Sequence, residues 1–258
     1  MFAAMPSAPA PSELGTVGYT VTPLLDAARL RALAGIAAEH LPPRLPGFWS
    51  ASRDRDKQVR RAVHEAVLAV LEPPLRAQFP EYRPVLCSLV AKPGGAPSGE
   101  VPLHQDWSFV DEQLWVSLNV WCPLQDVDEG NGCLEVVPGS HRAARQPRAA
   151  GAPFLFAGME PVLREHLRAV PMRAGDALVF DHCLIHGSSV NRTNMVRTAA
   201  TAALVPAVAP LLYYTQAGPD ADVCAYEVSP DVHLEHDPGA PPSDGRLVAR
   251  HRIRLAGG

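Results

Sequence analysis

The hydrophobic periodicity of the chain changes near Tyr82, and this change limits the possible folds more than any other feature. Before it, apolar residues recur at helical spacing in two stretches, at about 30–41 and 59–71. After it come short β-rich runs separated by Gly, Pro and Asp: YRPVLCSLVAK, LWVSLNVWCPL, GCLEVVPGS, DALVFDHCLIH and MVRTAATAALVPA. Helices followed by a series of strands are typical of an α+β protein. We therefore expect an antiparallel barrel or jelly roll with the helices packed on one outer face.

Prolines predict the limits of the two helices. Thr22 and Pro23 suit the N-cap and first position of the first helix. Pro73 and Pro74 are expected to end the second helix, because proline lacks the N–H that a helix interior requires.

The chain is expected to form one domain after a short lead-in. Residues 1–20 are rich in Ala, Pro and Ser, which predicts a flexible segment. Residues 21–258 are expected to be a single domain with its core at about 82–206. Residues 143–169 are expected to be a surface excursion with a short helix near 160–167. No structure is assigned to the polar tail after about residue 218, apart from a short strand or helix at 247–255.

Charge and cysteine usage exclude several classes of protein. The 258 residues carry a net charge of −4, so no basic field indicates a nucleic-acid or membrane partner. Five widely spaced cysteines without a CxxC pair indicate a reducing, cytoplasmic location. No apolar run has the length of a membrane span, and the N-terminus lacks the basic region of a signal peptide. No feature indicates an oligomeric state.

A histidine and an aspartate lie two positions apart in His104-Gln105-Asp106. On a strand such residues share a face, with Cα atoms about 6.6 Å apart. Their imidazole and carboxylate groups can then converge on one metal ion. A second histidine would complete a two-histidine, one-carboxylate site with open positions for a co-substrate and O2. An HxD pair alone also occurs by chance, so the second histidine carries the argument.

His182 and His186 are the candidates for that second histidine, in the run DHCLIHGS. The run follows GDALVF, which predicts a strand entered from a tight turn. Four residues along a strand separate Cα atoms by about 13 Å, so only one of the two is expected to bind the metal. The local pattern does not choose between them.

Three ordered blocks resemble the phytanoyl-CoA dioxygenase family: HQDW, NVWCPLQDVDEGNGCLEVVPGSHR and RAGDALVFDHCLIHGSSVNRTNMVR. The resemblance covers roughly Tyr82 to Pro206 and implies a double-stranded β-helix core of the jelly-roll or cupin-like kind. It implies Fe(II) held by His104, Asp106 and His186, with 2-oxoglutarate as co-substrate and O2 as oxidant.

The resemblance also implies an arginine beyond the metal-binding histidine, and that position is Arg197. A planar guanidinium suits the distal carboxylate of 2-oxoglutarate, because it can donate two parallel hydrogen bonds. Arg192 is the alternative, but its neighbours are turn formers that predict a solvent-facing loop. Ser188, two residues past His186, matches a family position that donates to the same carboxylate.

The strand expected at 114–124 divides by parity into two faces. One face carries Trp121 and Asn119, and the other carries Leu118 and Val120. The resemblance places Trp121 against the co-substrate, although packing in the core explains this residue equally well. Parity makes Asn119 a hydrogen-bond donor to the co-substrate.

From the resemblance we expect a dioxygenase that hydroxylates an unactivated C–H bond and releases CO2 and succinate. Asp106 argues against halogenation, because related halogenases have a small residue there. The segment from Lys92 to Leu103 offers one lysine and no cluster for CoA phosphates. A small-molecule substrate, such as a biosynthetic intermediate, is therefore favoured over an acyl-CoA. Trp107, Phe109 and Asp111 are expected to line the substrate pocket from a lid.

Two other functions stay open. A metal-dependent, cupin-like isomerase or lyase could use a similar barrel without 2-oxoglutarate, and a binding protein could use it without catalysis. His233 and His236 resemble a second metal pair, but their acidic, proline-rich surroundings predict a solvated surface.

Overall fold

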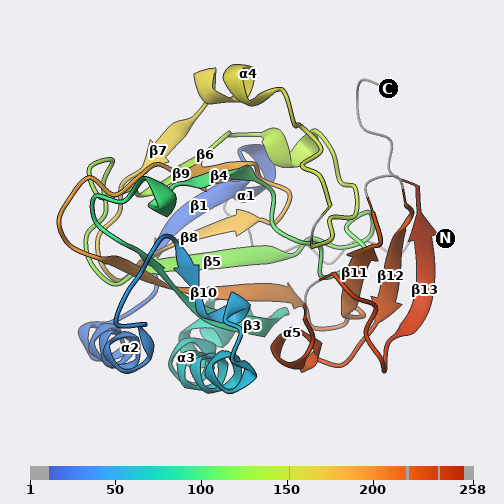
Figure 1. The fold of residues 1–258 in the computed structure, drawn as a ribbon, viewed down its shortest axis with the longest axis horizontal. Coiled ribbons are helices and arrows are strands. Elements are labelled where there is room, and N and C mark those ends of the chain that lie inside the picture. Colours follow the sequence, from blue (N-terminus) through green and yellow to red (C-terminus); the bar gives the residue numbers. More distant parts are fainter. Residues whose placement is uncertain (1–11, 151, 219–220, 238, 253–258) are drawn as a thin grey trace.

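The computed structural model describes residues 12–150, 152–218, 221–237 and 239–252. The protein is a mixed α/β structure whose paired strands are antiparallel and form three sheets. Figure 1 shows the two larger sheets in one body, with the third beside them.

The largest sheet has six strands in the order β1-β8-β5-β10-β3-β2. Its long central strand β10 (Arg197–Pro206) pairs on one side with β3 (Tyr82–Lys92) and on the other with β5 (Leu118–Pro123). The outer strands are β8 (Asp176–Asp181), β1 (Tyr19–Pro23) and β2 (Trp49–Ser50). The central strands have few exposed residues, as expected for a sheet covered on both faces.

Helices α2 (Ala27–His40) and α3 (Lys57–Gln78) lie along one face of this sheet (Figure 1). α3 begins at Asp56, whose side chain accepts a hydrogen bond from the Gln58 N–H at 2.8 Å. Its apolar residues recur every fourth position and belong to one buried cluster with strand residues: Leu33, Val63, Val67, Leu71 and Leu75 from the helices, and Leu89, Val120 and Val179 from the strands.

Both boundaries predicted from prolines are wrong. Thr22 and Pro23 end β1, and α2 starts instead after Asp26, whose carboxylate accepts from the Arg29 N–H. α3 continues through Pro73 and Pro74 to Gln78. The physical reason is burial of the last turn: the side chain of Leu75 is 1% exposed in the core, and this packing outweighs the local preference of proline.

The second sheet has four short strands in the order β4-β9-β6-β7. They are β4 (Val101–His104), β9 (His186–Ser188), β6 (Leu134–Val136) and β7 (Arg168–Val170). A second buried cluster joins this sheet to the face of the six-stranded sheet that the helices leave free: Val136 and Val170 contribute from one side, and Trp121, Leu178 and Phe180 from the other. The main cavity found in the described part of the chain is lined by residues of both sheets.

The two ends of the chain differ from expectation. Residues 12–20, expected to be part of a flexible lead-in, form α1 (Ser12–Thr16) and the start of β1, while residues 1–11 lie outside the described part. The tail forms a third sheet from β11 (Leu212–Gln216), β12 (Val223–Glu227) and β13 (Arg246–His251), with α5 (Val232–Glu235) between the last two. The excursion at 143–169 contains the helix α4 (Glu160–Glu165).

Candidate metal and co-substrate site

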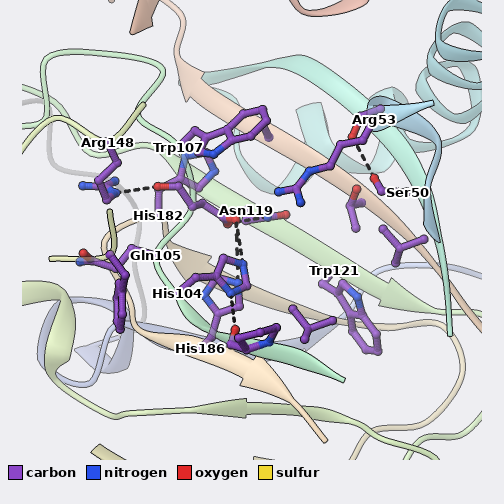
Figure 2. A pocket seen from close by; sticks show the side chains of 18 of the residues that line it. Ser50, Arg53, His104, Gln105, Trp107, Asn119, Trp121, Arg148, His182 and His186 are labelled. Atoms are coloured by element: carbon purple, nitrogen blue, oxygen red, sulfur yellow. Dashed lines mark hydrogen bonds and ion pairs between the residues drawn. The ribbon is translucent and has the colours of Figure 1, made fainter. Parts of the chain in front are cut away.

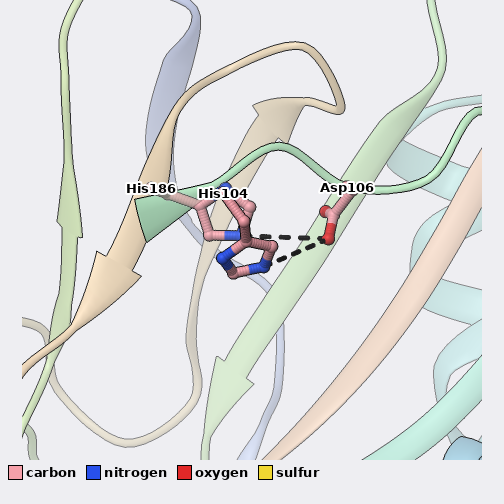
Figure 3. Close-up of side chains that lie close together, drawn as sticks. All are labelled: His104, Asp106 and His186. Atoms are coloured by element: carbon pink, nitrogen blue, oxygen red, sulfur yellow. Dashed lines mark ion pairs between the residues drawn. The ribbon is translucent and has the colours of Figure 1, made fainter. Parts of the chain in front are cut away.

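His104, Asp106 and His186 lie together at one end of the four-stranded sheet (Figure 3). His104 ends β4 and His186 begins β9, and the register pairs the two residues directly. One ligand atom from each of the three side chains lies within 4.8 Å of the others. Asp106 Oδ1 is 3.9 Å from Nε2 of each histidine. This spacing suits three donor atoms around one ion.

The backbone fixes the orientation of both histidines. His104 Nδ1 lies 2.8 Å from the Pro102 carbonyl oxygen, and His186 Nδ1 lies 3.0 Å from that of Leu184. Because a carbonyl only accepts, each Nδ1 carries the proton and each Nε2 presents a lone pair to the site. Burial and the neighbouring His186 lower the pKa of His104 to about 4, so its ring is neutral near pH 7.

Asp106 is held as a carboxylate with one oxygen free. The Asn119 side-chain N–H donates to Asp106 Oδ2 at 2.7 Å, which leaves Oδ1 directed at the two histidines. Burial alone would raise the pKa of Asp106. The nearby histidines and the Asn119 hydrogen bond outweigh burial and hold that pKa below its usual range. Two imidazole nitrogens and one carboxylate oxygen are a suitable donor set for a divalent transition metal.

His182, the other candidate, lies outside this cluster, whereas His186 lies within it. The ring of His182 is buried, and its Nδ1 lies 3.1 Å from the Ser117 hydroxyl. Beyond Ser117 lies a buried ion pair between Glu112 and Arg148 at 2.6 Å. Arg148 also donates to the Asp106 carbonyl oxygen at 2.6 Å and supports the loop that carries the carboxylate. The sequence analysis missed this network, because no local pattern links residues so far apart in the chain.

Arg197 is fully buried and lines the same cavity, and its guanidinium is only partly satisfied. Nη2 donates to the Gly132 carbonyl oxygen at 3.2 Å, and the ring of Trp121 lies 5.1 Å from the guanidinium carbon. Nε and Nη1 have no hydrogen-bond partner among the described residues. Burial lowers the pKa of Arg197 to about 10. Buried donors without acceptors are costly, so this group is suited to an anionic ligand.

Lys92 is a second buried cation beside Arg197 that the sequence analysis did not single out. The two residues are directly paired across β3 and β10. Lys92 Nζ donates to the Ser188 hydroxyl at 2.6 Å, to its carbonyl oxygen at 3.1 Å and to the Ser189 carbonyl oxygen. Burial and the charge of Arg197 lower the pKa of Lys92 to about 7. The signal was parity, because Lys92 shares a strand face with Ser88 and Val90, which both line the cavity.

The cavity joins these groups and has a volume of about 500 Å³. Figure 2 shows His104, His186, Asn119 and Trp121 around it. Ser188 and Arg197 line it too. Trp107 and Phe109 line it as expected, whereas Asp111 does not: its carboxylate accepts from the Gln113 N–H in a turn.

Solvent exposure was predicted for Arg192 and for His233, and the structure confirms only the first. Arg192 is exposed, as its turn-forming neighbours predicted. The solvated surface predicted for His233 is wrong, because its ring is buried between Phe109 and Tyr213, with centroids at 4.7 and 5.5 Å. Burial lowers the pKa of His233 to about 3, so it is a neutral packing residue.

The antiparallel sheets and the His-Asp-His cluster define a candidate metalloprotein. Comparison with known protein families identifies its family. The family model of phytanoyl-CoA dioxygenase (PhyH) matches residues 30–199, more than half of the chain. This protein belongs to the phytanoyl-CoA dioxygenase family. No helix in the described ranges combines the length and apolar character that a membrane span requires.

Curated relatives match a shorter part. The peroxisomal phytanoyl-CoA dioxygenase of Bos taurus is 32% identical over 120 residues, 43% of this chain and 36% of that protein. Phytanoyl-CoA dioxygenase domain-containing protein 1 of Mus musculus is 33% identical over 117 residues, 42% of this chain and 40% of that protein. The matched segment thus spans only about two-fifths of either relative.

Solved structures share the fold over more of the chain. The α-ketoglutarate-dependent carbocyclase SnoK from nogalamycin biosynthesis has a TM-score of 0.59 at 20% identity, covering 92% of this chain and 94% of SnoK. The epimerase SnoN, in complex with Fe3+, α-ketoglutarate and a nogalamycin compound, has a TM-score of 0.55 at 24% identity, covering 78% of this chain and 83% of SnoN.

Proposed function

We propose that this protein is an Fe(II)- and 2-oxoglutarate-dependent dioxygenase that hydroxylates a small metabolite. One observation carries the proposal: a single cavity is lined by His104, Asp106 and His186 and also by Arg197, whose Nε and Nη1 have no hydrogen-bond partner among the described residues. We also infer that the two larger sheets form a double-stranded β-helix and that residues 21–258 are one domain.

The three side chains fit an iron ion. Both Nε2 lone pairs and the free Asp106 Oδ1 face the same point, and hydrogen bonds from Nδ1 and from Asn119 hold them there. Such second partners orient metal ligands and are needed for tight binding. Three protein ligands leave coordination positions for a chelating 2-oxo acid and O2.

The group of residues around Arg197 fits the distal carboxylate of 2-oxoglutarate. Arg197 offers two unpartnered N–H groups. Lys92 donates to Ser188 Oγ, so the Ser188 hydroxyl hydrogen is free to donate into the cavity. Trp121 packs against the guanidinium and shields this end from water. We assign co-substrate binding to Arg197, Ser188 and Trp121, with Asn119 at the metal end.

Bound iron and 2-oxoglutarate would together supply the oxidation of a substrate C–H bond, with release of CO2 and succinate. The chain positions the substrate, keeps Asp106 deprotonated and excludes water. SnoK and SnoN are described as a carbocyclase and an epimerase, so related folds host other outcomes. Hydroxylation is the outcome proposed here, since Asp106 occupies the position that halogenases leave small.

The test is an anaerobic titration of 2-oxoglutarate into the Fe(II)-loaded protein. A weak visible charge-transfer band is expected in the wild type and absent in His186→Ala. Arg197→Gln should need far more co-substrate, whereas the exposed Arg192→Gln, a matched control, should behave as wild type. Bound iron without a band would contradict the proposal and favour the isomerase or lyase, and no iron binding would favour a binding protein.

A further inference from the structure

Three arginines line the cavity, and Lys92 is paired with one of them across the sheet. All of these basic residues except Arg53 have a partner or a proposed ligand. Arg148 is ion-paired with Glu112 and donates to the Asp106 backbone. Lys92 is held by Ser188 and its neighbour, and Arg197 faces the proposed co-substrate end. Arg53 is the fourth, and it lines the cavity from the six-stranded sheet side, at the end of the short helix η1 (Ala51–Arg53).

The Arg53 guanidinium is oriented but not neutralised. It stacks over the ring of Trp107 with its central carbon 4.9 Å from the centroid. No ion pair or hydrogen bond of its side chain occurs within the described ranges. The adjacent Asp54 is directed elsewhere: its carboxylate accepts from Trp49 Nε1 at 3.1 Å and from the Asp56 N–H at 3.0 Å.

The acidic residues that line the cavity do not balance this charge. They are Glu100 and Asp106. Glu100 lies 3.3 Å from Arg164 in an ion pair outside the cavity, and Asp106 belongs to the metal cluster. Figure 2 shows Arg53 extending toward the side of the cavity where Trp107 and Asn119 lie. Among the described residues that line the cavity, the charge of Arg53 therefore has no acidic partner.

Hydroxyl groups continue the polar surface next to Arg53. The Ser50 and Ser52 hydroxyls are 2.9 Å apart, and the Ser52 N–H donates to Ser88 Oγ at 2.9 Å. All three serines line the cavity. The residues 147–155 contribute mainly apolar side chains to its lining, among them Pro147 and Phe154. The lining therefore suits a molecule with one charged end and an apolar body.

We propose that Arg53, held by Trp107, is the recognition site for an anionic group of the primary substrate, a carboxylate or a phosphate attached to an apolar body. The proposal deepens the proposed function of the same cavity and rests on it. Because the guanidinium is already stacked on Trp107, it can present its N–H edge to the anion. Little further side-chain entropy is then lost when the anion binds. In the Ser50–Ser52 pair one hydroxyl donates to the other, which leaves the second hydroxyl hydrogen to donate to a remaining anion oxygen. Arg53 therefore selects acids over their neutral counterparts.

The test is calorimetric binding of phenylacetate, phenyl phosphate and neutral phenylacetamide to the full chain, loaded anaerobically with Fe(II) and saturating 2-oxoglutarate. At least one anion is expected to bind the wild type and to bind Arg53→Gln about tenfold more weakly, as for loss of one charge-assisted contact. Arg53→Lys should fall between them. Arg55→Gln, on the same loop but outside the cavity, is the matched control and should bind as wild type. Preference for phenyl phosphate or for phenylacetate then identifies the anion.

Three results would overturn the assignment: equal binding of the acids and the amide, no anion binding to the wild type, or anion binding lost in Arg197→Gln but retained in Arg53→Gln. Failure of the proposed function has a different signature, because the 2-oxoglutarate band is then absent from the wild type. Repeating the titrations without iron and 2-oxoglutarate tests Arg53 in that case as well. Arg53 is exposed, so its variants are expected to fold, and their melting curves check this.

Discussion

Replacing Arg197 by methionine is expected to separate stability from co-substrate binding. Burial lowers the pKa of this arginine from 12.5 to about 10, with the side chain 1% exposed. This difference corresponds to roughly 3 kcal/mol of destabilisation of the charged form. The penalty is fully present below pH 10, where the guanidinium is charged in both the folded and the unfolded chain, and it fades as pH rises toward 12.5.

Two contacts offset part of that penalty. Arg197 Nη2 donates to the Gly132 carbonyl oxygen, and the guanidinium lies against the Trp121 ring. Each contributes about 1 kcal/mol. Without ligands, the Arg197→Met protein is therefore expected to be more stable than the wild type by roughly 1 kcal/mol, which raises Tm by about 2–4 °C for a chain of this size.

Co-substrate binding should change in the opposite direction. A buried, bidentate contact between a guanidinium and a carboxylate contributes at least about 3 kcal/mol. Its loss should weaken 2-oxoglutarate binding by at least about 100-fold. The assay is scanning calorimetry of both proteins with and without millimolar 2-oxoglutarate, in the presence of Fe(II) and absence of O2. The wild type should gain stability with ligand, and the variant should gain almost none.

A variant that 2-oxoglutarate stabilises as much as the wild type would refute the assignment of Arg197 to the distal carboxylate. A ligand-free variant less stable than the wild type by more than about 2 kcal/mol would refute the argument that the unpartnered charge is a net cost. Arg192→Met controls for the loss of one positive charge, because Arg192 is exposed.

Three further predictions follow from single contacts. Asn119→Ala should weaken iron binding by about 10–100-fold in a chelator competition, since it removes the hydrogen bond that orients the metal carboxylate. In the wild type, 2-oxoglutarate affinity should fall as pH rises through about 7, where Lys92 loses its charge, and Lys92→Met should bind weakly without this pH dependence. Gly18→Ala should lower the free energy of unfolding by about 2 kcal/mol or more, because φ is +90° and the added Cβ would meet His141 Nδ1. Chemical denaturation measures the free energy of unfolding. Gly15→Ala is the control, because nothing lies within 4 Å of a Cβ added at Gly15.

The sequence predicted the parts of the fold that depend on local pattern. Parity placed Trp121 and Asn119 on the cavity side of β5 and Leu118 and Val120 on the helix side, as the core clusters show. This works because strand alternation is a property of the backbone and needs no knowledge of the partner strand.

Features that depend on distant partners were missed or misplaced. Strand parity indicates which face carries Lys92, but its hydrogen bond to Ser188, 96 residues away, leaves no trace in the local pattern. The proline rule failed in α3 because tertiary burial of Leu75 overrides a local preference. His233 was assigned to the surface from its polar neighbours, but its environment is set by Phe109, far away in the chain.

The contact between Arg197 and Gly132 has a consequence for how the protein withstands proteolysis. The proposed co-substrate end is assembled from four chain segments, at Lys92, Gly132, Ser188 and Arg197, that meet only when the two larger sheets are closed together. A ligand that needs all four segments binds the folded chain and not the unfolded one, so raising its concentration increases the free energy of unfolding. The lifetime of the purified protein against proteolysis should then lengthen as 2-oxoglutarate is added.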